Sequence, residues 1–251
     1  MHGNGGSPAL VNGKLIFSCD GSKDPFVIAL NSQDGKPVWR TKRTANAKKK
    51  FSFCTPLVID TAKGKQVVLP GSGMIGAYNP DTGQEIWKAT YGDGYSVVPR
   101  PVTAHGMVFF GSGFDRATAL AVKLGGSGDV TESHLAWRIT KGAPHTPSML
   151  VVGEELYMVS DGGIASCVDA KTGKIHWSER LGGGHSASPI FSKGRIYFTS
   201  EAGVVNVVSA EKNYKLLSSN KLNERSLASP AVADNALFIR TSDHMWRFEQ
   251  Q

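Results

Sequence analysis

The stretch DAKTGKIHW at Asp169–Trp177 repeats, with small changes, NPDTGQEIW at Asn79–Trp87 and NSQDGKPVW at Asn31–Trp39. In all three, a polar turn carries glycine at the same place, and tryptophan follows four residues later. Glycine adopts a left-handed backbone without steric cost, so the pattern predicts a hairpin turn in each copy. The glycines of these turns are Gly35, Gly83 and Gly173.

A second marker, a hydroxyl residue followed by proline and an apolar run, recurs along the chain. Its copies are Ser7-Pro8, Thr55-Pro56, Thr146-Pro147, Ser188-Pro189 and Ser229-Pro230, and Arg100-Pro101 fills the remaining place. The successive prolines lie 48, 45, 46, 42 and 41 residues apart. This period matches a four-stranded β-propeller blade, and proline is tolerated where a strand begins. The markers therefore predict six repeat units.

Each unit reads as short apolar strands separated by glycine turns, which predicts an antiparallel meander. No helical period occurs anywhere in the chain. We expect an all-β fold, a single β-propeller domain over residues 1–251 built from four-stranded antiparallel blades. The expected blades are 7–48, 49–93, 94–140, 141–181, 182–224 and 225–251, the last without its outer strand.

Tryptophan on the outermost strand predicts a seal between neighbouring blades, because an indole there buries about 150–250 Å². Trp137 takes this place after a longer, glycine-rich hairpin, and in the fifth unit SAEKNYKLLSSNKL puts leucine there. The residues with this structural docking role are Trp39, Trp87, Trp137 and Trp177.

The repeat A-x-N/D-x-x-T/D-G-x-x-x-W resembles the tryptophan-docking motif of quinoprotein dehydrogenase-like propellers. Ala29–Trp39 and Ala77–Trp87 match it, and Cys167–Trp177 matches with cysteine for alanine. The whole chain is similar to the PQQ-binding-like β-propeller repeat proteins, a class that includes the outer-membrane assembly lipoprotein of the β-barrel insertion machinery. This resemblance implies a periplasmic or cell-envelope location and an eight-bladed ring, of which this chain is an incomplete part.

The resemblance also implies an alternative, a quinone-dependent enzyme. Enzymes of this class hold PQQ against two adjacent, disulfide-linked cysteines, with calcium bound by Glu, Asn and Asp and with a catalytic Asp. Here Cys19, Cys54 and Cys167 are far apart, and no such acidic set is recognisable. We therefore expect no cofactor, no metal site and no catalytic residue, with PQQ and calcium as the alternative. The acidic stretch DGSKD at Asp20–Asp24 lacks the features of a calcium loop and predicts a polar turn.

The net charge of +7 favours anionic partners. The densest basic run, Lys42–Lys50, lacks the interleaved aromatic residues of a nucleic-acid interface, so no nucleic-acid binding is expected. The sequence contains no transmembrane segment, and its N-terminus does not resemble a signal peptide. These features favour a protein or envelope component, or an anionic ligand, as the partner.

The loops that join one blade to the next emerge on one face of a propeller, so the residues before each proline predict a channel mouth. Basic and imidazole groups there predict a binding site, and the alternative is a surface that only solvates the mouth. The residues expected to converge are His2, Lys49, Lys50, Tyr95, Arg100, His145, His185 and Arg225.

Together these patterns predict a non-catalytic binding or scaffold protein of the bacterial cell envelope. The alternatives are a PQQ-dependent, alcohol dehydrogenase-like oxidoreductase and the sensor propeller of a larger regulatory protein. Because the sixth unit ends after three strands, we also expect an open ring whose exposed blade edges self-associate.

Overall fold

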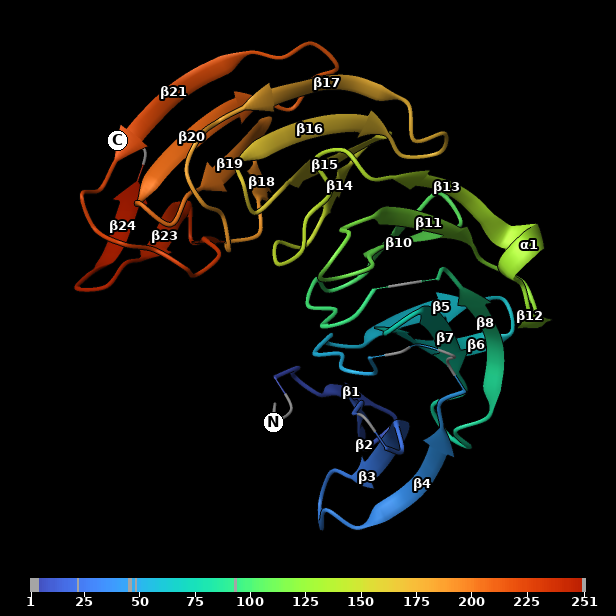
Figure 1. Ribbon diagram of the computed structural model, residues 1–251. Helices are drawn as coiled ribbons and strands as arrows, with labels where there is room; N and C mark the ends of the chain where they lie inside the picture. The colour runs from blue at the N-terminus through green and yellow to red at the C-terminus, as the bar shows by residue number, and fades with distance from the viewer. Residues whose placement is uncertain (1–4, 22, 45–46, 48, 93, 250–251) are drawn as a thin grey trace. The chain divides into compact units, whose positions relative to one another are not determined.

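The computed structural model describes residues 5–21, 23–44, 47, 49–92 and 94–249. The chain divides into two compact units, Met1–Thr140 and Lys141–Gln251. In Figure 1 each unit contains three sheets that follow one another in chain order. The division coincides with the boundary expected between the third and fourth blades, and the assignment of one single domain stays a prediction.

The first unit contains three sheets, which the turn glycines divide into short strands. The first sheet comprises β1 Ala9–Val11, β2 Lys14–Cys19, β3 Phe26–Asn31 and β4 Pro37–Lys42. The second comprises β5 Leu57–Thr61, β6 Gly64–Gly71, β7 Met74–Tyr78 and β8 Glu85–Thr90. The third comprises β9 Val102–Ala104, β10 Met107–Gly111, β11 Ala119–Lys123 and β13 Leu135–Ile139.

The second unit continues the same pattern. The fourth sheet comprises β14 Leu150–Val152, β15 Glu155–Val159, β16 Ile164–Asp169 and β17 Ile175–Arg180. The fifth comprises β18 Ile190–Ser192, β19 Arg195–Thr199, β20 Val204–Ser209 and β21 Leu216–Lys221. Within the described residues, the sixth sheet has three strands, β22 Ala231–Ala233, β23 Ala236–Arg240 and β24 Met245–Glu249.

The turn predicted from the repeated glycines is confirmed. Gly35, Gly83 and Gly173 have φ angles of 72°, 75° and 73°, all in the left-handed region. Each glycine lies in the hairpin between the third and fourth strands of its sheet. The turn therefore sets the register of the outer strand in each copy.

A small residue lies opposite the tryptophan in each of the first four sheets, and a register shift follows directly after it. The cross-strand pairs are Ala29–Trp39, Ala77–Trp87, Ala121–Trp137 and Cys167–Trp177. Directly opposite Cβ atoms lie only about 4.5–5.5 Å apart, so a small side chain leaves room for the indole. This contact explains the alanine that opens the repeat.

The hydroxyl residue ahead of each first strand has a structural role of its own. The Ser7 amide donates to Thr55 Oγ1 over 3.1 Å. The Ser148 amide donates to Ser188 Oγ, and the Ser188 amide donates to Ser229 Oγ, over 2.9 Å each. These bonds link the starts of neighbouring sheets.

The same bonds correct the position of the fourth marker. The first strand of the fourth sheet begins at Leu150. Ser148 therefore occupies the hydroxyl position and Met149 the proline position. Thr146-Pro147, which the sequence places there, lies two residues too early in the crossover loop.

The long hairpin of the third unit departs from a plain meander. Its strand β12, Gly128–Asp129, pairs in parallel with β8 of the second sheet, at Trp87 and Lys88. The four-residue helix α1, Thr131–His134, follows at once, and among the described residues it is the one helix in an otherwise all-β fold.

A buried ion pair stabilises the contact between the first and second sheets. Arg43 Nη1 lies 2.9 Å from Asp20 Oδ2, and both side chains are almost completely buried. A Cβ atom at Gly71 would lie 2.5 Å from Arg43 Nη2, so only glycine leaves room for the guanidinium.

At the other end of the acidic stretch Asp20–Asp24, Asp24 pairs with Arg40 over 2.8 Å. The acidic stretch that the sequence assigned to a polar turn is thus engaged in ion pairs at both ends.

Candidate functional site

Two of the four docking tryptophans reach the following sheet through hydrogen bonds. Trp39 Nε1 donates to the Pro80 carbonyl over 3.0 Å, and Trp177 Nε1 donates to the Glu211 carbonyl over 3.1 Å. Both carbonyls lie in the turn before the outer strand of the next sheet. The Trp177 ring also meets Tyr214 of that turn edge-on, with ring centroids 5.1 Å apart.

The other two tryptophans make different contacts. Trp87 Nε1 donates to Gln66 Oε1 of its own sheet over 3.1 Å, while its ring packs in a buried cluster that includes Phe110 of the third sheet. Trp137 stacks on Phe109 of its own sheet, with centroids 5.8 Å apart. Position in the repeat therefore predicts a ring that is buried, or partly buried at Trp39, but not its hydrogen-bond partner.

The fifth sheet corrects a second assignment. Ser218 pairs with Val207 where the other sheets pair tryptophan with alanine or cysteine. The leucine expected at this position is therefore wrong. The distance from Val207 to Ser218 is 11 residues (218 − 207), whereas that from Cys167 to Trp177 is 10 (177 − 167), because the fifth hairpin is one residue longer.

Three of the cations in the first unit line one cavity of about 690 Å³, which we call the basic pocket. Its cations are Lys49, Arg116 and Arg138, and its one carboxylate is Asp115. The remaining lining residues are Ala47, Tyr91, Gly94, Tyr95, Thr118 and Thr140. Three positive groups against one negative group make the pocket suited to an anion.

Lys49 and Tyr95, both expected at the mouth, are brought together in this pocket. Lys49 Nζ donates to Tyr95 Oη over 2.9 Å and lies 4.1 Å from the centroid of its ring. Asp115 Oδ2 is 4.0 Å from Lys49 Nζ. The hydrogen bond to Tyr95 raises the pKa of Lys49, so its ammonium stays charged across the neutral range.

Close packing of two loops forms the wall of the basic pocket. The Phe114 amide donates to the Tyr95 carbonyl over 2.6 Å, and the two rings meet edge-on at 5.7 Å. Gly113 has φ of 84°, and a Cβ atom there would lie 2.3 Å from the Tyr95 carbonyl oxygen. The glycine turn between the second and third strands is thus what lets the crossover loop approach.

The remaining mouth residues do not share this pocket. Lys50 is partly exposed, and Arg100 and Arg225 are exposed. The Arg225 guanidinium lies 3.9 Å from Glu201 Oε2. The convergence of residues from both units on one opening stays a prediction, and His2 lies outside the described residues.

The two histidines expected at the mouth, His145 and His185, have different surroundings. The His145 backbone amide donates to Asp161 Oδ2 over 2.6 Å, and the side chain is partly exposed. The His185 ring is fully buried, so it is not available to a ligand at a solvent-filled mouth. Burial lowers the pKa of His185, which keeps the imidazole neutral near pH 7. Among the described residues, neither of its ring nitrogens has a hydrogen-bond partner.

Sequence reasoning missed Asp115, Arg116 and Arg138. Asp115 and Arg116 belong to the loop between β10 and β11, and Arg138 lies on the outer strand next to Trp137. The sequence prediction considered only the crossover loops, and neither the β10–β11 loop nor the outer strand β13 is one of them. The signal that could have found Asp115 and Arg116 is the repeated turn between the second and third strands, because Gly113 of this turn lies against Tyr95 of the crossover loop.

The described residues do not reproduce the PQQ and calcium site of the enzymes that the repeat resembles. Cys19, Cys54 and Cys167 form no disulfide with one another and belong to different parts of the fold. Within the described ranges, no three His, Cys, Asp or Glu side chains gather as metal ligands. The absence of a cofactor in the working protein stays a prediction.

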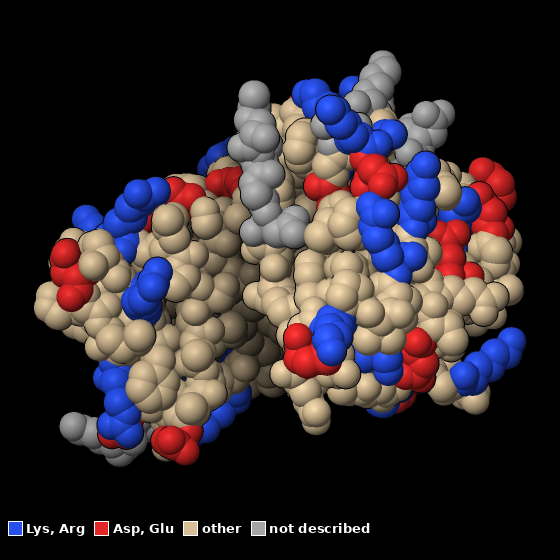
Figure 2. Space-filling model, turned by 90° about the horizontal axis from the view of Figure 1, so that it is seen from below, with Lys and Arg blue, Asp and Glu red and all other residues tan. Residues whose placement is uncertain are grey.

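Charge on the surface is mixed. On the face drawn in Figure 2, Lys and Arg side chains lie among Asp and Glu side chains and do not merge into one basic field. No helix in the described part of the chain is long and apolar enough to cross a membrane.

Comparison with known proteins gives one family and several relatives. A family model described as "Outer membrane protein assembly factor BamB" matches residues 2–179 and 71–244. The outer membrane protein assembly factor BamB of Shewanella oneidensis is 25% identical over 231 residues, which cover 87% of this chain and 54% of that protein. The chain thus spans about half the length of this curated relative.

A quinoprotein is also among the relatives. The quinoprotein ethanol dehydrogenase of Pseudomonas aeruginosa is 32% identical over 96 residues, which cover 35% of this chain and 15% of the enzyme.

Among solved structures, the crystal structure of BamB from Moraxella catarrhalis gives a TM-score of 0.66 at 14% identity, with 95% of this chain and 70% of that chain covered. The predicted β-propeller fold with four-stranded antiparallel sheets is confirmed, and the number of blades in a complete ring stays a prediction.

Proposed function

The chain belongs to the family of the outer membrane protein assembly factor BamB, and from this premise we propose that it is a non-catalytic β-propeller that binds proteins of the bacterial cell envelope. The partner would be held during protein assembly at the outer membrane, since the name of the relative from Shewanella oneidensis is outer membrane protein assembly factor BamB. The observation that best supports the proposal is the basic pocket, a cavity in the first unit that is lined mainly by loop residues on a rigid scaffold.

The chemistry of the pocket suggests which group of a partner enters it. Arg116 has no ion pair with any described residue, and Arg138 contributes only a long bond of 3.4 Å to the Tyr91 carbonyl. Lys49 is already engaged by Tyr95 and Asp115. We assign the two arginines to a carboxylate of the partner, since a guanidinium binds a carboxylate through two parallel hydrogen bonds.

A defined acidic probe tests this assignment. Fluorescence anisotropy with a short, labelled glutamate-rich peptide should report saturable binding that weakens as sodium chloride is raised. The double variant Arg116→Gln with Arg138→Gln should weaken binding about tenfold or more. The matched control is Lys36→Gln with Lys63→Gln, which removes the same charge from hairpin turns that do not line the pocket. Equal affinity in both double variants would sink the assignment.

The alternative function is favoured by one finding, the local similarity to a quinoprotein ethanol dehydrogenase. Titration with PQQ and calcium, followed by absorbance and by reduction of a dye in the presence of ethanol, distinguishes the two. Our proposal expects no saturable, calcium-dependent quinone binding and no dye reduction. Dye reduction would replace it by an oxidoreductase. Self-association through exposed sheet edges and a role as a sensor domain remain predictions.

A further inference from the structure

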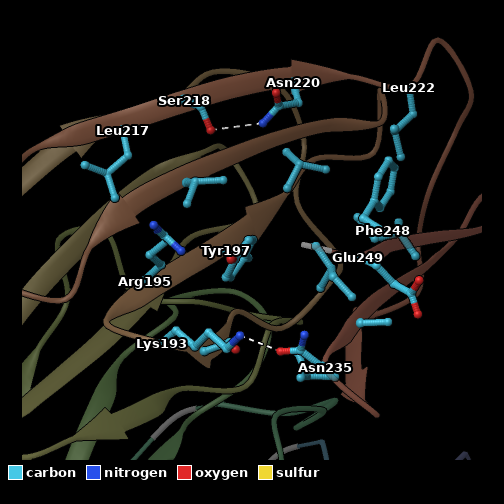
Figure 3. A pocket seen from close by; sticks show the side chains of 17 residues that line it. Lys193, Arg195, Tyr197, Leu217, Ser218, Asn220, Leu222, Asn235, Phe248 and Glu249 are labelled. Atoms are coloured by element: carbon cyan, nitrogen blue, oxygen red, sulfur yellow. Dashed lines mark hydrogen bonds between the residues drawn. The ribbon is translucent and has the colours of Figure 1, made fainter. Parts of the chain in front are cut away.

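The junction between the fifth and sixth sheets contains a cavity of about 630 Å³, which we call the fifth-sheet pocket. Its apolar wall comes from facing strands of the two sheets, with Tyr197, Val207 and Ile239 among its members. Ser218 and Asn220 of β21 line it too, and Ser218 Oγ accepts a hydrogen bond from Asn220 Nδ2 over 3.0 Å. Figure 3 shows these side chains around the open space.

The equivalent place one sheet earlier is filled by an aromatic ring. Tyr157 pairs with Cys167 as Tyr197 pairs with Val207, so Trp177 and Ser218 occupy the same position of the repeat. There the Trp177 ring is 7% exposed. It lies 6.1 Å from the Tyr157 ring and 5.1 Å from the Tyr214 ring, measured between centroids.

In the fifth sheet the partner tyrosine remains but the indole is absent. The outer strand β21 is exposed along its whole length, and Leu217 beside Ser218 is 41% exposed. An apolar cavity next to a tyrosine face loses dispersion contacts that a flat ring would restore. The cavity therefore offers a planar aromatic group an apolar wall with a tyrosine ring in it.

The charge at the rim is also reversed relative to the fourth sheet. Glu155 and Arg195 occupy the same register position, opposite Asp169 and Ser209. Glu155 Oε1 is 3.3 Å from Lys212 Nζ of the following turn. Arg195, by contrast, has no hydrogen bond or ion pair with a described residue. The Glu155 carboxylate of the fourth sheet, which pairs with Lys212 of the next sheet, is thus replaced in the fifth sheet by the Arg195 guanidinium. Arg195 lines the pocket and has no anionic partner among the described residues.

The other charged groups of the rim are already paired. Lys193 Nζ donates to Asn235 Oδ1 over 2.5 Å, which ties the fifth sheet to the sixth. Glu249 forms an ion pair with Arg247. In Figure 3, Arg195 lies between Leu217 and Lys193, whereas Phe248 and Glu249 lie at the other side of the space. One end of the pocket is therefore cationic and the rest of its wall is largely apolar.

We propose that the fifth-sheet pocket binds an aromatic ligand that carries one anionic group. The ring takes the place that the indole of Trp177 occupies in the fourth sheet, against Tyr197 and Val207. The anion pairs with the Arg195 guanidinium, with Lys193 beside it. This site belongs to the second unit and does not depend on the basic pocket or on the function proposed for it.

The test uses two fluorescent probes on the intact chain. The first is 8-anilinonaphthalene-1-sulfonate, which joins an aromatic system to an anion, and the second is the uncharged N-phenyl-1-naphthylamine. We expect saturable binding of the sulfonate to one site with enhanced emission. Arg195→Glu should weaken sulfonate binding about tenfold or more and leave the uncharged probe within about twofold.

Filling the pocket gives the second arm. Ser218→Trp should weaken both probes about tenfold or more, because the indole occupies the same space. The matched control is Ser219→Trp, one residue along the same strand, which does not line the pocket. Circular dichroism melts check that each variant folds. Should Ser218→Trp fail to fold, Arg195→Glu still decides the matter, because its side chain is exposed.

The proposal is overturned by any of three results. These are sulfonate binding that does not saturate, unchanged sulfonate affinity in Arg195→Glu, and equal loss of affinity in Ser218→Trp and Ser219→Trp.

Discussion

The junction between the fourth and fifth sheets and the junction between the fifth and sixth sheets share one strand register. At the first, Trp177 lies opposite Cys167 and bonds to the next sheet through the Glu211 carbonyl. At the second, Ser218 lies opposite Val207 and a cavity of about 630 Å³ remains. The repeat of the backbone thus persists when the tryptophan is lost, and the fifth and sixth sheets still pack through Val205, Val207 and Ile239 beside the cavity.

The largest test of this comparison removes the indole. Trp177→Ala should destabilise the second unit by about 3–5 kcal/mol, because it removes a buried ring and leaves a cavity in a closed junction. The matched change Ser218→Ala should alter stability by less than about 0.5 kcal/mol, since its site is already open. Urea unfolding followed by circular dichroism measures both. Equal midpoints for the two variants would show that the junctions do not differ as described.

A glycine pair sharpens the comparison at another closed junction. A Cβ atom at Gly83 would lie 2.5 Å from the Trp39 ring, whereas at Gly35 it would meet nothing within 4 Å. Both glycines have left-handed backbones, so Gly35→Ala should cost about 1–2 kcal/mol. Gly83→Ala should cost about 1–3 kcal/mol more, because the indole must also move. Thermal melts of the two variants give the difference directly, and identical melts would contradict a tight Trp39 contact.

The loops of the two junctions predict a difference in response to acid. His185 and Ser226 each donate a backbone amide to the preceding turn, at the carbonyls of Asp161 and Glu201. Ser226 Oγ donates to the Arg240 carbonyl over 2.9 Å, whereas the His185 ring is buried with no partner in the described part of the chain.

Burial lowers the pKa of His185 from its ordinary 6.5, so the unfolded chain takes up the proton first as the pH falls. Stability should therefore decrease below pH 6.5, by at most about 1.4 kcal/mol per pH unit, until the folded pKa is reached. Urea midpoints at about pH 7.5 and pH 5.5 measure it. His185→Gln should reduce the difference between the two pH values, and an unchanged difference would assign the effect to other groups.

The smallest expected effect rebuilds the closed junction in the open one. Ser218→Trp alone places an indole opposite Val207, where the other sheets have alanine or cysteine. Val207→Ala should therefore relieve the crowding, and the double variant should be more stable than the sum of the single changes by about 0.5–1.5 kcal/mol. A double-mutant cycle from denaturant curves provides this coupling. Strict additivity would mean that the small partner residue is not what admits the indole.

Much of the fold followed from residues that act locally. The glycine turns and the small residue opposite tryptophan can be read from spacing, because a hairpin fixes the pairing on either side of it. The two misplacements, at Thr146-Pro147 and at the leucine of the fifth sheet, both come from loops whose lengths differ from the average. Spacing alone cannot tell that an inserted residue belongs to the turn rather than to the strand.

The candidate sites were harder to predict for a related reason. Lys49 and Tyr95 were expected together because both precede a first strand, and they do form one contact. Arg116 and Arg138 come from a turn and an outer strand, and they meet those loops only through the packing of the sheets. His185 shows the converse, because its place in a loop predicted exposure while the surrounding turns bury it.

The cysteine opposite Trp177, Cys167, allows the opening rate of the closed junction to be measured by thiol labelling. Burial raises the pKa of the Cys167 thiol to about 11, so near neutral pH the thiol is protonated and unreactive toward an alkylating reagent. The side chain is also fully buried, so the reagent cannot reach it. Modification of Cys167 must then wait for the fourth and fifth sheets to separate. Its labelling rate in the unaltered chain would count those openings, with the partly exposed Cys19 as a faster internal reference.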